Sequence, residues 1–210
     1  MTFKNRVKHF MNGMLSNHEI VSRIKLDLRD YVKNPSDIID VGVYQGTEFL
    51  LDTFTESFYH LVEPNQSTYN YIEREILNKY KGKLYKCAAG EKEGSLYLSS
   101  NDDESRINLD TGVLVPVKKL DDIIELKDAH NAVLKVDVEG HELQVLKGAS
   151  QLLEDCIMVI LELRLRGPKK VNEPSEIIDF LAKRGFRFVD ILSEGRRKEG
   201  LNFIDAVFMK

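Results

Sequence analysis

Short apolar runs alternate with amphipathic stretches along most of this chain. DIIDVGV (37–43), FYHLVEP (58–64) and KLYKCAA (83–89) are rich in β-branched and aromatic residues, and glycine or proline stands near the end of the first two. These runs predict buried strands. Residues 47–54 and 65–80 carry apolar side chains at helical spacing, which predicts a helix after each of the first two strands.

The second half of the chain continues this alternation. Strands are predicted at NAVLKVDVEG (131–140), CIMVILELR (156–164), FRFVDIL (186–192) and NFIDAVFM (202–209), and helices at HELQVLKGASQLLED (141–155) and PSEIIDFLAKRG (174–185). Because strands that alternate with helices require right-handed crossovers, the predicted fold class is α/β, with a doubly wound, mostly parallel sheet covered on both faces. Only a loop separates the last two strands, so we expect an antiparallel final strand.

Two parts of the chain depart from the alternation. Residues 1–35 predict an N-terminal helical extension, and residues 36–210 predict the α/β domain itself. After the third strand, SLYLSS alternates, NDDESRINLD is polar, and VPVKKLDDII combines a short strand with a helical turn. We interpret the region near 95–115 as a polar lid insertion over one end of the sheet, with Ser105 and Arg106 as candidate substrate contacts.

Composition narrows the classes of function. With 210 residues and 42% hydrophobic side chains, the chain can form one globular domain. Its 30 basic and 34 acidic residues give a net charge of -4, so we expect no nucleic-acid partner. No apolar run approaches the roughly 18 residues that a transmembrane segment needs. Cys87 and Cys156 stand alone in predicted strands, which favours buried thiols and a cytoplasmic location. The sequence does not fix the oligomeric state.

Glycines and carboxylates stand where the first two strands end. DVGVYQG places Asp40, Gly42 and Gly46 at the first strand-to-helix turn, and Glu63 closes the second strand. Glycines let the backbone approach a ligand, and a carboxylate at the second position can accept both hydroxyls of a ribose. This spacing alone does not separate NAD from S-adenosylmethionine. A pyrophosphate favours G-x-G-x-x-G, whereas Tyr44 occupies the place of the middle glycine, so a ligand without phosphates fits better. The ammonium group of S-adenosylmethionine would find a partner in Asp40, directly or through water.

A second polar motif follows the fourth predicted strand. KVDVEGHELQVLKGA (135–149) resembles the signature of the FkbM-type methyltransferase family, which is Lys-x-Asp-x-Glu-Gly-x-Glu followed by Leu-Lys-Gly-Ala. The resemblance continues through DVGVYQG, HLVEPN, CAAGEKEG, VPVKKLDDII and VILELR, in the family's order. The first turn departs from the family pattern at Val43 and Tyr44, where a small residue and often asparagine stand.

The resemblance implies a class I Rossmann-like methyltransferase fold, S-adenosylmethionine as the methyl donor, and a hydroxyl acceptor on a sugar, a glycan or a related natural product. A methyltransferase with a nitrogen or carboxylate acceptor and a non-catalytic nucleoside-binding module are the rival functions. The predicted cofactor contacts are Asp40, Gly42, Tyr44, Gly46, Glu63, Asn65 and Ala88.

Charged residues gather at the end of the fourth strand, where ligands of a doubly wound sheet bind. Methyl transfer to an alcohol needs a general base, and Asp137 is the first candidate because it ends the strand that faces the donor. His141 and Glu139 are the alternative catalytic residues. Lys135 lies deeper, and we expect it to form a structural ion pair with Glu162 rather than to act directly. Glu162 is also a candidate substrate contact. No metal is expected, although Asp137, Glu139 and Glu162 leave a Mg2+ site open as an alternative.

Overall fold

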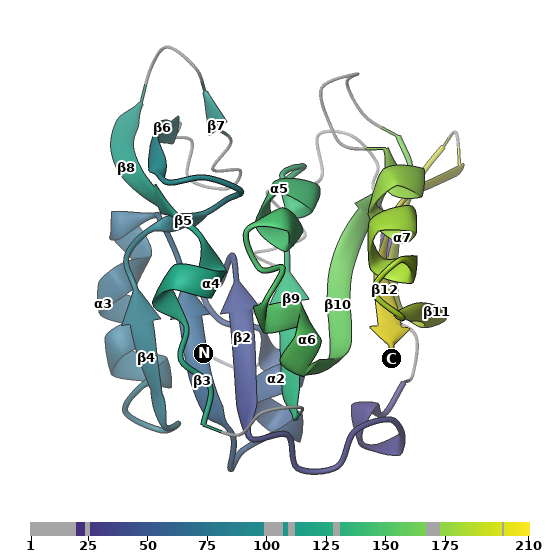
Figure 1. The fold of residues 1–210 in the computed structure, drawn as a ribbon, viewed down its shortest axis with the longest axis horizontal. Helices are drawn as coiled ribbons and strands as arrows, with labels where there is room; N and C mark the ends of the chain where they lie inside the picture. The colour runs from purple at the N-terminus through teal and green to yellow at the C-terminus, as the bar shows by residue number, and fades with distance from the viewer. Residues whose placement is uncertain are drawn as a thin grey trace.

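The structure, a computed structural model, describes residues 20–23, 26–98, 107–108, 112–127, 131–166, 173–198 and 200–210. Most of these residues belong to two β-sheets and to the helices that pack on the larger one (Figure 1). Within the described ranges, no helix is long and apolar enough to cross a bilayer. Cys87 and Cys156 are both buried free thiols, as predicted.

The larger sheet contains, among the described residues, eight strands in the order β1-β11-β12-β10-β9-β2-β3-β4. Its parallel part consists of β2 (Asp37–Val41), β3 (Phe58–Val62), β4 (Gly82–Tyr85), β9 (Ala132–Val136) and β10 (Cys156–Arg164). The last strand, β12 (Gly200–Met209), pairs antiparallel with both β10 and β11 (Arg187–Arg197). The predicted mostly parallel sheet with an antiparallel final strand is therefore confirmed.

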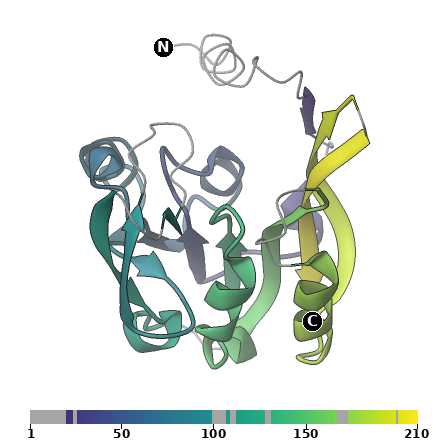
Figure 2. The same ribbon diagram turned by 90° about the horizontal axis from the view of Figure 1, so that it is seen from above.

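Helices cover both faces of this sheet, as the view from above shows (Figure 2). One face carries the 3-10 helices η1 (Leu28–Asp30) and η2 (Gln66–Thr68), the α-helices α2 (Glu48–Thr53) and α3 (Tyr69–Tyr71), and the π-helix η3 (Ile72–Ile76). The other face carries α4 (Leu120–Ile123), α5 (Glu142–Lys147), α6 (Leu152–Asp155) and α7 (Pro174–Ala182). The central strands are thus buried on both sides, which explains their continuous apolar runs.

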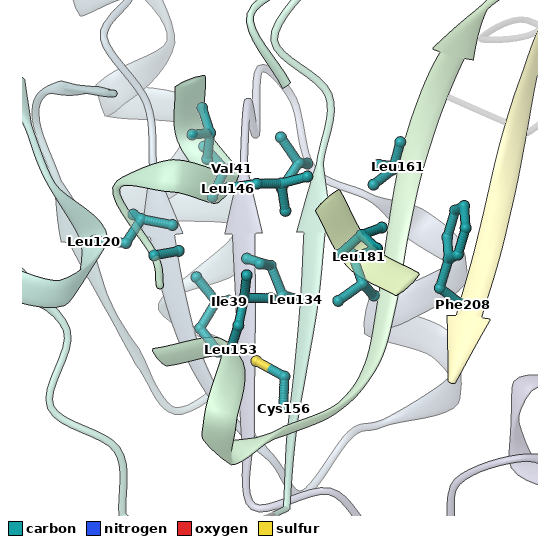
Figure 3. Close-up of a cluster of buried hydrophobic side chains, with 14 of the residues drawn as sticks. Ile39, Val41, Leu120, Leu134, Leu146, Leu153, Cys156, Leu161, Leu181 and Phe208 are labelled. Atoms are coloured by element: carbon teal, nitrogen blue, oxygen red, sulfur yellow. The ribbon is translucent and has the colours of Figure 1, made fainter. Parts of the chain in front are cut away.

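The core under α4 to α7 is built from strand and helix side chains that meet face to face (Figure 3). Leu134 of β9 and Leu161 of β10 contribute from the sheet, and Leu146 of α5 and Leu181 of α7 contribute from the helices. Each of these four leucines is at most 1% exposed. Burial of a leucine side chain contributes about 1.5–3 kcal/mol, so this layer fixes the position of β9, which carries the polar motif at its end.

The smaller sheet has the order β5-β8-β6-β7 among the described residues. Its strands are β5 (Ala88–Ala89), β6 (Gly94–Leu98), β7 (Ile107–Asn108) and β8 (Val113–Lys118). In Figure 1 it stands at the same end of the large sheet as the start of α5. The predicted insertion near 95–115 overlaps this sheet, while Ser105 and Arg106 lie outside the described residues. The lid function therefore stays a prediction.

Three predicted helices are corrected by the structure. The helix predicted at 141–155 is split, because the Asp121 carboxylate accepts hydrogen bonds from the amides of Gln151 (3.1 Å) and Leu152 (2.9 Å) and so begins α6 as a separate helix. The single helix predicted at 65–80 consists of η2, α3 and η3 in succession.

The third correction concerns the predicted N-terminal helical extension. Residues 20–23 form strand β1 (Ile20–Arg23), which pairs antiparallel with β11. The helical prediction is wrong there, because backbone pairing at the edge of the sheet overrides the local pattern. Residues 1–19 lie outside the described part of the chain.

Candidate functional site

The turn between β2 and α2 adopts backbone conformations that most side chains disfavour. Gly42, Tyr44 and Gly46 have positive φ angles of 82°, 48° and 100°. A Cβ on Gly42 would also overlap the carbonyl oxygen of Asp137, so this position requires glycine for space as well as for conformation. A left-handed backbone conformation costs Tyr44 about 1–2 kcal/mol, so contacts with neighbouring residues must stabilise it.

One of these contacts comes from Glu63, which follows β3. Its Oε2 accepts a hydrogen bond from the Tyr44 amide, and its Oε1 accepts one from the Asn65 amide, both at 2.7 Å. Glu63 is only 5% exposed, and burial raises its pKa while the two amides act in the opposite direction. Each carboxylate oxygen keeps a further lone pair, so Glu63 can accept two more hydrogen bonds.

The other two predicted cofactor residues of this region serve local structure. The Asn65 side chain accepts a hydrogen bond from the Ser67 amide at 3.0 Å and caps η2. Ala88 begins β5 and packs with Leu98 and Val115 in the small apolar cluster of the second sheet. Ala88 thus helps to pack the smaller sheet beside the carboxyl ends of the large sheet's strands, and its side chain offers a ligand no polar group.

Three contacts join the first turn to the turn that follows β9. The Asp137 amide donates a hydrogen bond to the Val41 carbonyl at 3.0 Å, and Lys135 Nζ donates one to the Gly42 carbonyl at 3.1 Å. The third contact is the close approach of Gly42 to the Asp137 carbonyl. The sequence prediction that these two segments meet at one edge of the sheet is therefore confirmed.

The predicted ion pair between Lys135 and Glu162 is wrong. Lys135 Nζ lies 3.3 Å from Asp40 Oδ1 and 3.6 Å from Asp137 Oδ2. The strand register explains this choice, because Asp40 of β2 stands directly opposite Lys135 of β9, whereas β10 places Ile160 opposite it. Burial alone would lower the pKa of Lys135, but the two carboxylates more than offset it and raise the pKa above its ordinary value.

This pairing changes the role expected for Asp40. The residue is 2% exposed, and burial raises its pKa, with Lys135 acting in the opposite direction. Asp40 therefore lies beneath the glycine turn as the partner of Lys135. A direct contact between Asp40 and a ligand's ammonium group does not fit this burial.

The buried Glu142 side chain stabilises the turn after β9 by accepting hydrogen bonds from its backbone. Glu139 and Gly140 both have positive φ angles, at 57° and 103°. Glu142 Oε1 accepts hydrogen bonds from the amides of Gly140 (2.9 Å) and Val138 (3.4 Å), and Glu142 itself is 1% exposed. Glu142 therefore holds this helix terminus.

The candidate bases stand in different surroundings. The Asp137 side chain is 39% exposed, so an acceptor can reach it. His141 precedes α5, and burial lowers its pKa, which favours the neutral imidazole. Glu139 forms an ion pair with Arg164 Nη2. Of the three candidates, Glu139 is held by the Arg164 guanidinium, whereas Asp137 is partly exposed and lies 3.6 Å from Lys135 Nζ.

Glu162 lies on the neighbouring strand, β10, and is 8% exposed. Its Oε1 accepts a hydrogen bond from Arg164 Nε at 2.6 Å. Burial, together with the negative charges of Asp137, Asp205 and Glu142, raises the pKa of Glu162 to about 9. These effects favour the protonated form of Glu162, whereas its contact with the Arg164 guanidinium favours the carboxylate. No group of three carboxylate, imidazole or thiol side chains in the described ranges is arranged to hold a metal ion.

Two functional candidates escaped the sequence reasoning. Glu142 belongs to the 135–149 motif, but no role was assigned to it. Arg164 stands two residues after Glu162 on β10, so both side chains leave the same face of the strand. That spacing is the signal that would have identified Arg164 as a partner of Glu162.

Comparisons with known proteins agree with this geometry. The family model described as "Methyltransferase FkbM domain" matches residues 40–188. Among solved structures, a methyltransferase FkbM from Methylobacillus flagellatus is 17% identical with a TM-score of 0.53, and the match covers 84% of this chain and 44% of that one. An rRNA methylase from Streptococcus thermophilus is 10% identical with a TM-score of 0.51, covering 90% of this chain and 99% of that one.

At these identities the two structures show a shared fold, which confirms the predicted α/β class. The present chain spans less than half the length of the Methylobacillus protein. The comparison with curated proteins finds no similar sequence.

Proposed function

Because this chain belongs to the FkbM family of S-adenosylmethionine-dependent methyltransferases, we propose that it transfers a methyl group to a hydroxyl of a sugar, a glycan or a related natural product. The observation that carries this proposal is the contact between the two turns. It brings the partly exposed Asp137 next to the glycine turn that Glu63 supports. The family's cofactor and a candidate base then share one edge of the sheet.

The first turn fits a nucleoside without phosphates. Glu63 has two lone pairs left for the ribose hydroxyls, and glycine at positions 42 and 46 lets the turn beside it adopt positive φ angles. The turn carries Tyr44 in place of the glycine that a pyrophosphate would favour. We propose Gly42, Tyr44, Gly46 and Glu63 as direct contacts, with the Asn65 and Ala88 backbones bordering them. Asp40 supports the turn through Lys135.

When bound, S-adenosylmethionine supplies a methyl group on a positively charged sulfur. Asp137 would accept the proton of the acceptor hydroxyl as this methyl group is transferred. Lys135 Nζ, 3.6 Å from Asp137 Oδ2, orients that carboxylate. His141 is the alternative base, since burial favours its neutral form.

The acceptor side of the proposal rests on the groups around Asp137. A sugar presents several hydroxyls, and this edge offers both acceptors and a donor. Asp137 can accept hydrogen bonds, and the raised pKa of Glu162 favours its protonated form, which can also donate one. A net charge of -4 favours a small-molecule or glycan acceptor over nucleic acid. The two buried thiols are consistent with the cytoplasmic location that we propose.

A screen of acceptors tests this function. Free sugars, nucleotide-linked sugars, amines, carboxylic acids and RNA would be incubated with S-adenosylmethionine, and release of S-adenosylhomocysteine would be measured. We expect release with one or more sugars. In that reaction Asp137→Asn should lower kcat by about 100-fold with the affinity for S-adenosylmethionine unchanged, since a general base contributes about 10²–10⁴-fold.

Asp52→Asn is the matched control, because Asp52 is an exposed carboxylate of α2. It should match the wild-type protein. Methylation of amines, carboxylic acids or RNA alone would contradict the hydroxyl proposal. Binding of S-adenosylmethionine without release for any acceptor would favour the non-catalytic module.

A further inference from the structure

Arg164 links the end of β10 to the turn that follows β9. Its Nε donates a hydrogen bond to Glu162 Oε1 at 2.6 Å, and its Nη2 forms an ion pair with Glu139 Oε2. The Arg164 side chain is 23% exposed, so solvent screens these contacts only in part. One guanidinium therefore joins two neighbouring strand ends at the candidate site.

The Arg164 end of this link is rigid. Arg164 is the last residue of β10 and pairs with Phe203 of β12. The following amides, of Leu165 and Arg166, both donate hydrogen bonds to the Asn202 carbonyl, at 2.8 and 3.2 Å. The backbone of Arg164 is thus fixed by the antiparallel pair of strands.

The Glu139 end of the link needs support. Glu139 has a φ of 57°, which costs a non-glycine residue about 1–2 kcal/mol. Glu142 holds the amides of Val138 and Gly140 but leaves the Glu139 side chain unrestrained. The ion pair with Arg164 supplies that restraint.

We infer that Arg164 is a positioning residue for methyl transfer, which holds the turn from Asp137 to His141 through Glu139 so that the base faces the acceptor. This inference rests on the proposed function. Arg164 itself contacts carboxylates of the protein and does not take the proton.

The chemistry of this link requires arginine. A guanidinium presents several N–H groups in one plane and can bind two carboxyl groups at once, whereas a lysine ammonium is a point charge. Nη2 forms an ion pair with Glu139, and Nε donates a hydrogen bond to Glu162 that fixes the direction of the guanidinium. Lysine would keep the charge but lose one of the two contacts.

The test compares Arg164→Gln, Arg164→Lys, Glu139→Gln and the double variant Arg164→Gln/Glu139→Gln. The control is Arg29→Gln, which removes the same charge from an exposed pair with Asp27. Three quantities are measured: kcat with a hydroxyl acceptor, the Kd of S-adenosylmethionine, and amide hydrogen exchange over residues 137–141.

We expect Arg164→Gln to lower kcat by about 10- to 100-fold, because a displacement of about 1 Å at a reacting group can cost 10²-fold. The Kd should change less than about two-fold. Exchange should rise at residues 137–141 and stay the same elsewhere in the large sheet. Arg164→Lys should recover part of kcat, and the double variant should be no slower than the slower single variant, because both changes break one link.

The outcomes separate this inference from the proposed function. If wild type methylates a hydroxyl and Arg164→Gln matches Arg29→Gln in kcat, or changes only KM, the inference is overturned and the function stands. If wild type methylates no hydroxyl but Arg164→Gln still raises exchange at residues 137–141, the proposed function fails and the hold of Arg164 on the turn stands. Unchanged exchange in that turn overturns the inference in either case.

Discussion

Replacing Lys135 with methionine would measure how much the buried ion pair beneath the site contributes to the free energy of unfolding. Lys135 Nζ lies 3.3 Å from Asp40 Oδ1, and the two residues are 7% and 2% exposed. In the Lys135→Met variant the Asp40 carboxylate stays buried but loses its counter-ion. Within the described residues, Asp40 Oδ1 makes no hydrogen bond, and the Thr47 side chain would remain as an uncharged partner of the carboxylate.

The expected loss of stability follows from this geometry. Opposite unit charges 3.3 Å apart attract by about 5 kcal/mol at an effective dielectric constant of about 20. Removing one partner of a buried pair typically costs about 3–5 kcal/mol. We therefore expect the free energy of unfolding to fall by about 3–5 kcal/mol near pH 7. In the double variant Lys135→Met/Asp40→Asn most of this loss should return, because no uncompensated carboxylate remains.

The loss should also depend on pH. Burial raises the pKa of Asp40, and Lys135 acts against that shift, so the variant's folded Asp40 ionises at a higher pH than in the wild type. The deficit of the variant should therefore be smallest in acid, where Asp40 is protonated in both folded and unfolded chains. It should grow as the pH rises through the raised pKa of Asp40 in the folded wild type, where the wild-type carboxyl ionises before that of the variant.

Urea unfolding of the wild type and the two variants at pH 5 and pH 8, under otherwise equal conditions, measures these differences. A deficit below about 1 kcal/mol would refute the reasoning, because exposed ion pairs contribute that little. The reasoning would also be refuted if the double variant Lys135→Met/Asp40→Asn were no more stable than Lys135→Met.

Three further substitutions have defined outcomes. Gly42→Ala should weaken binding of S-adenosylmethionine by at least about 10-fold in calorimetry, since its Cβ would overlap the Asp137 carbonyl; wild-type affinity would contradict this. Glu63→Ala should weaken binding by about 100-fold, because two charge-assisted hydrogen bonds of about 1.5 kcal/mol each are lost; a loss below about three-fold would count against the ribose contact. Glu162→Gln should become more stable relative to the wild type as the pH rises from 5 to 9. Because the folded pKa of Glu162 is about 9, the wild-type residue ionises more readily in the unfolded chain over this range, and this destabilises the wild type only. A difference between the urea midpoints that stays constant with pH would contradict this prediction.

Much of the fold could be predicted from the sequence because its signals are local. The apolar runs that became β2, β3, β9 and β10 are short and β-branched, and the loop between β11 and β12 is too short for a crossover. The errors arose where distant residues decide the structure. The cap that Asp121 places on α6 comes from 30 residues earlier in the chain, and β1 exists only through its pairing with β11.

The candidate site shows the same division. The glycine turn and Glu63 could be located because each ends a predicted strand. The partner of Lys135 could not, because it depends on strand register. The parallel pairing of β2 with β9 places Asp40 opposite Lys135, and the antiparallel pairing of β10 with β12 places Glu162 opposite Asp205. A slip of two residues along a strand leaves the apolar pattern unchanged, so the sequence contains no signal for the correct pair.

A crystal structure of the protein with S-adenosylhomocysteine tests the central claim most directly. We expect both ribose hydroxyls within hydrogen-bond distance of the Glu63 carboxylate, the methionine part along the turn from Gly42 to Gly46, and the sulfur facing Asp137. A ligand bound away from this turn, or one whose sulfur points away from Asp137, would contradict the account.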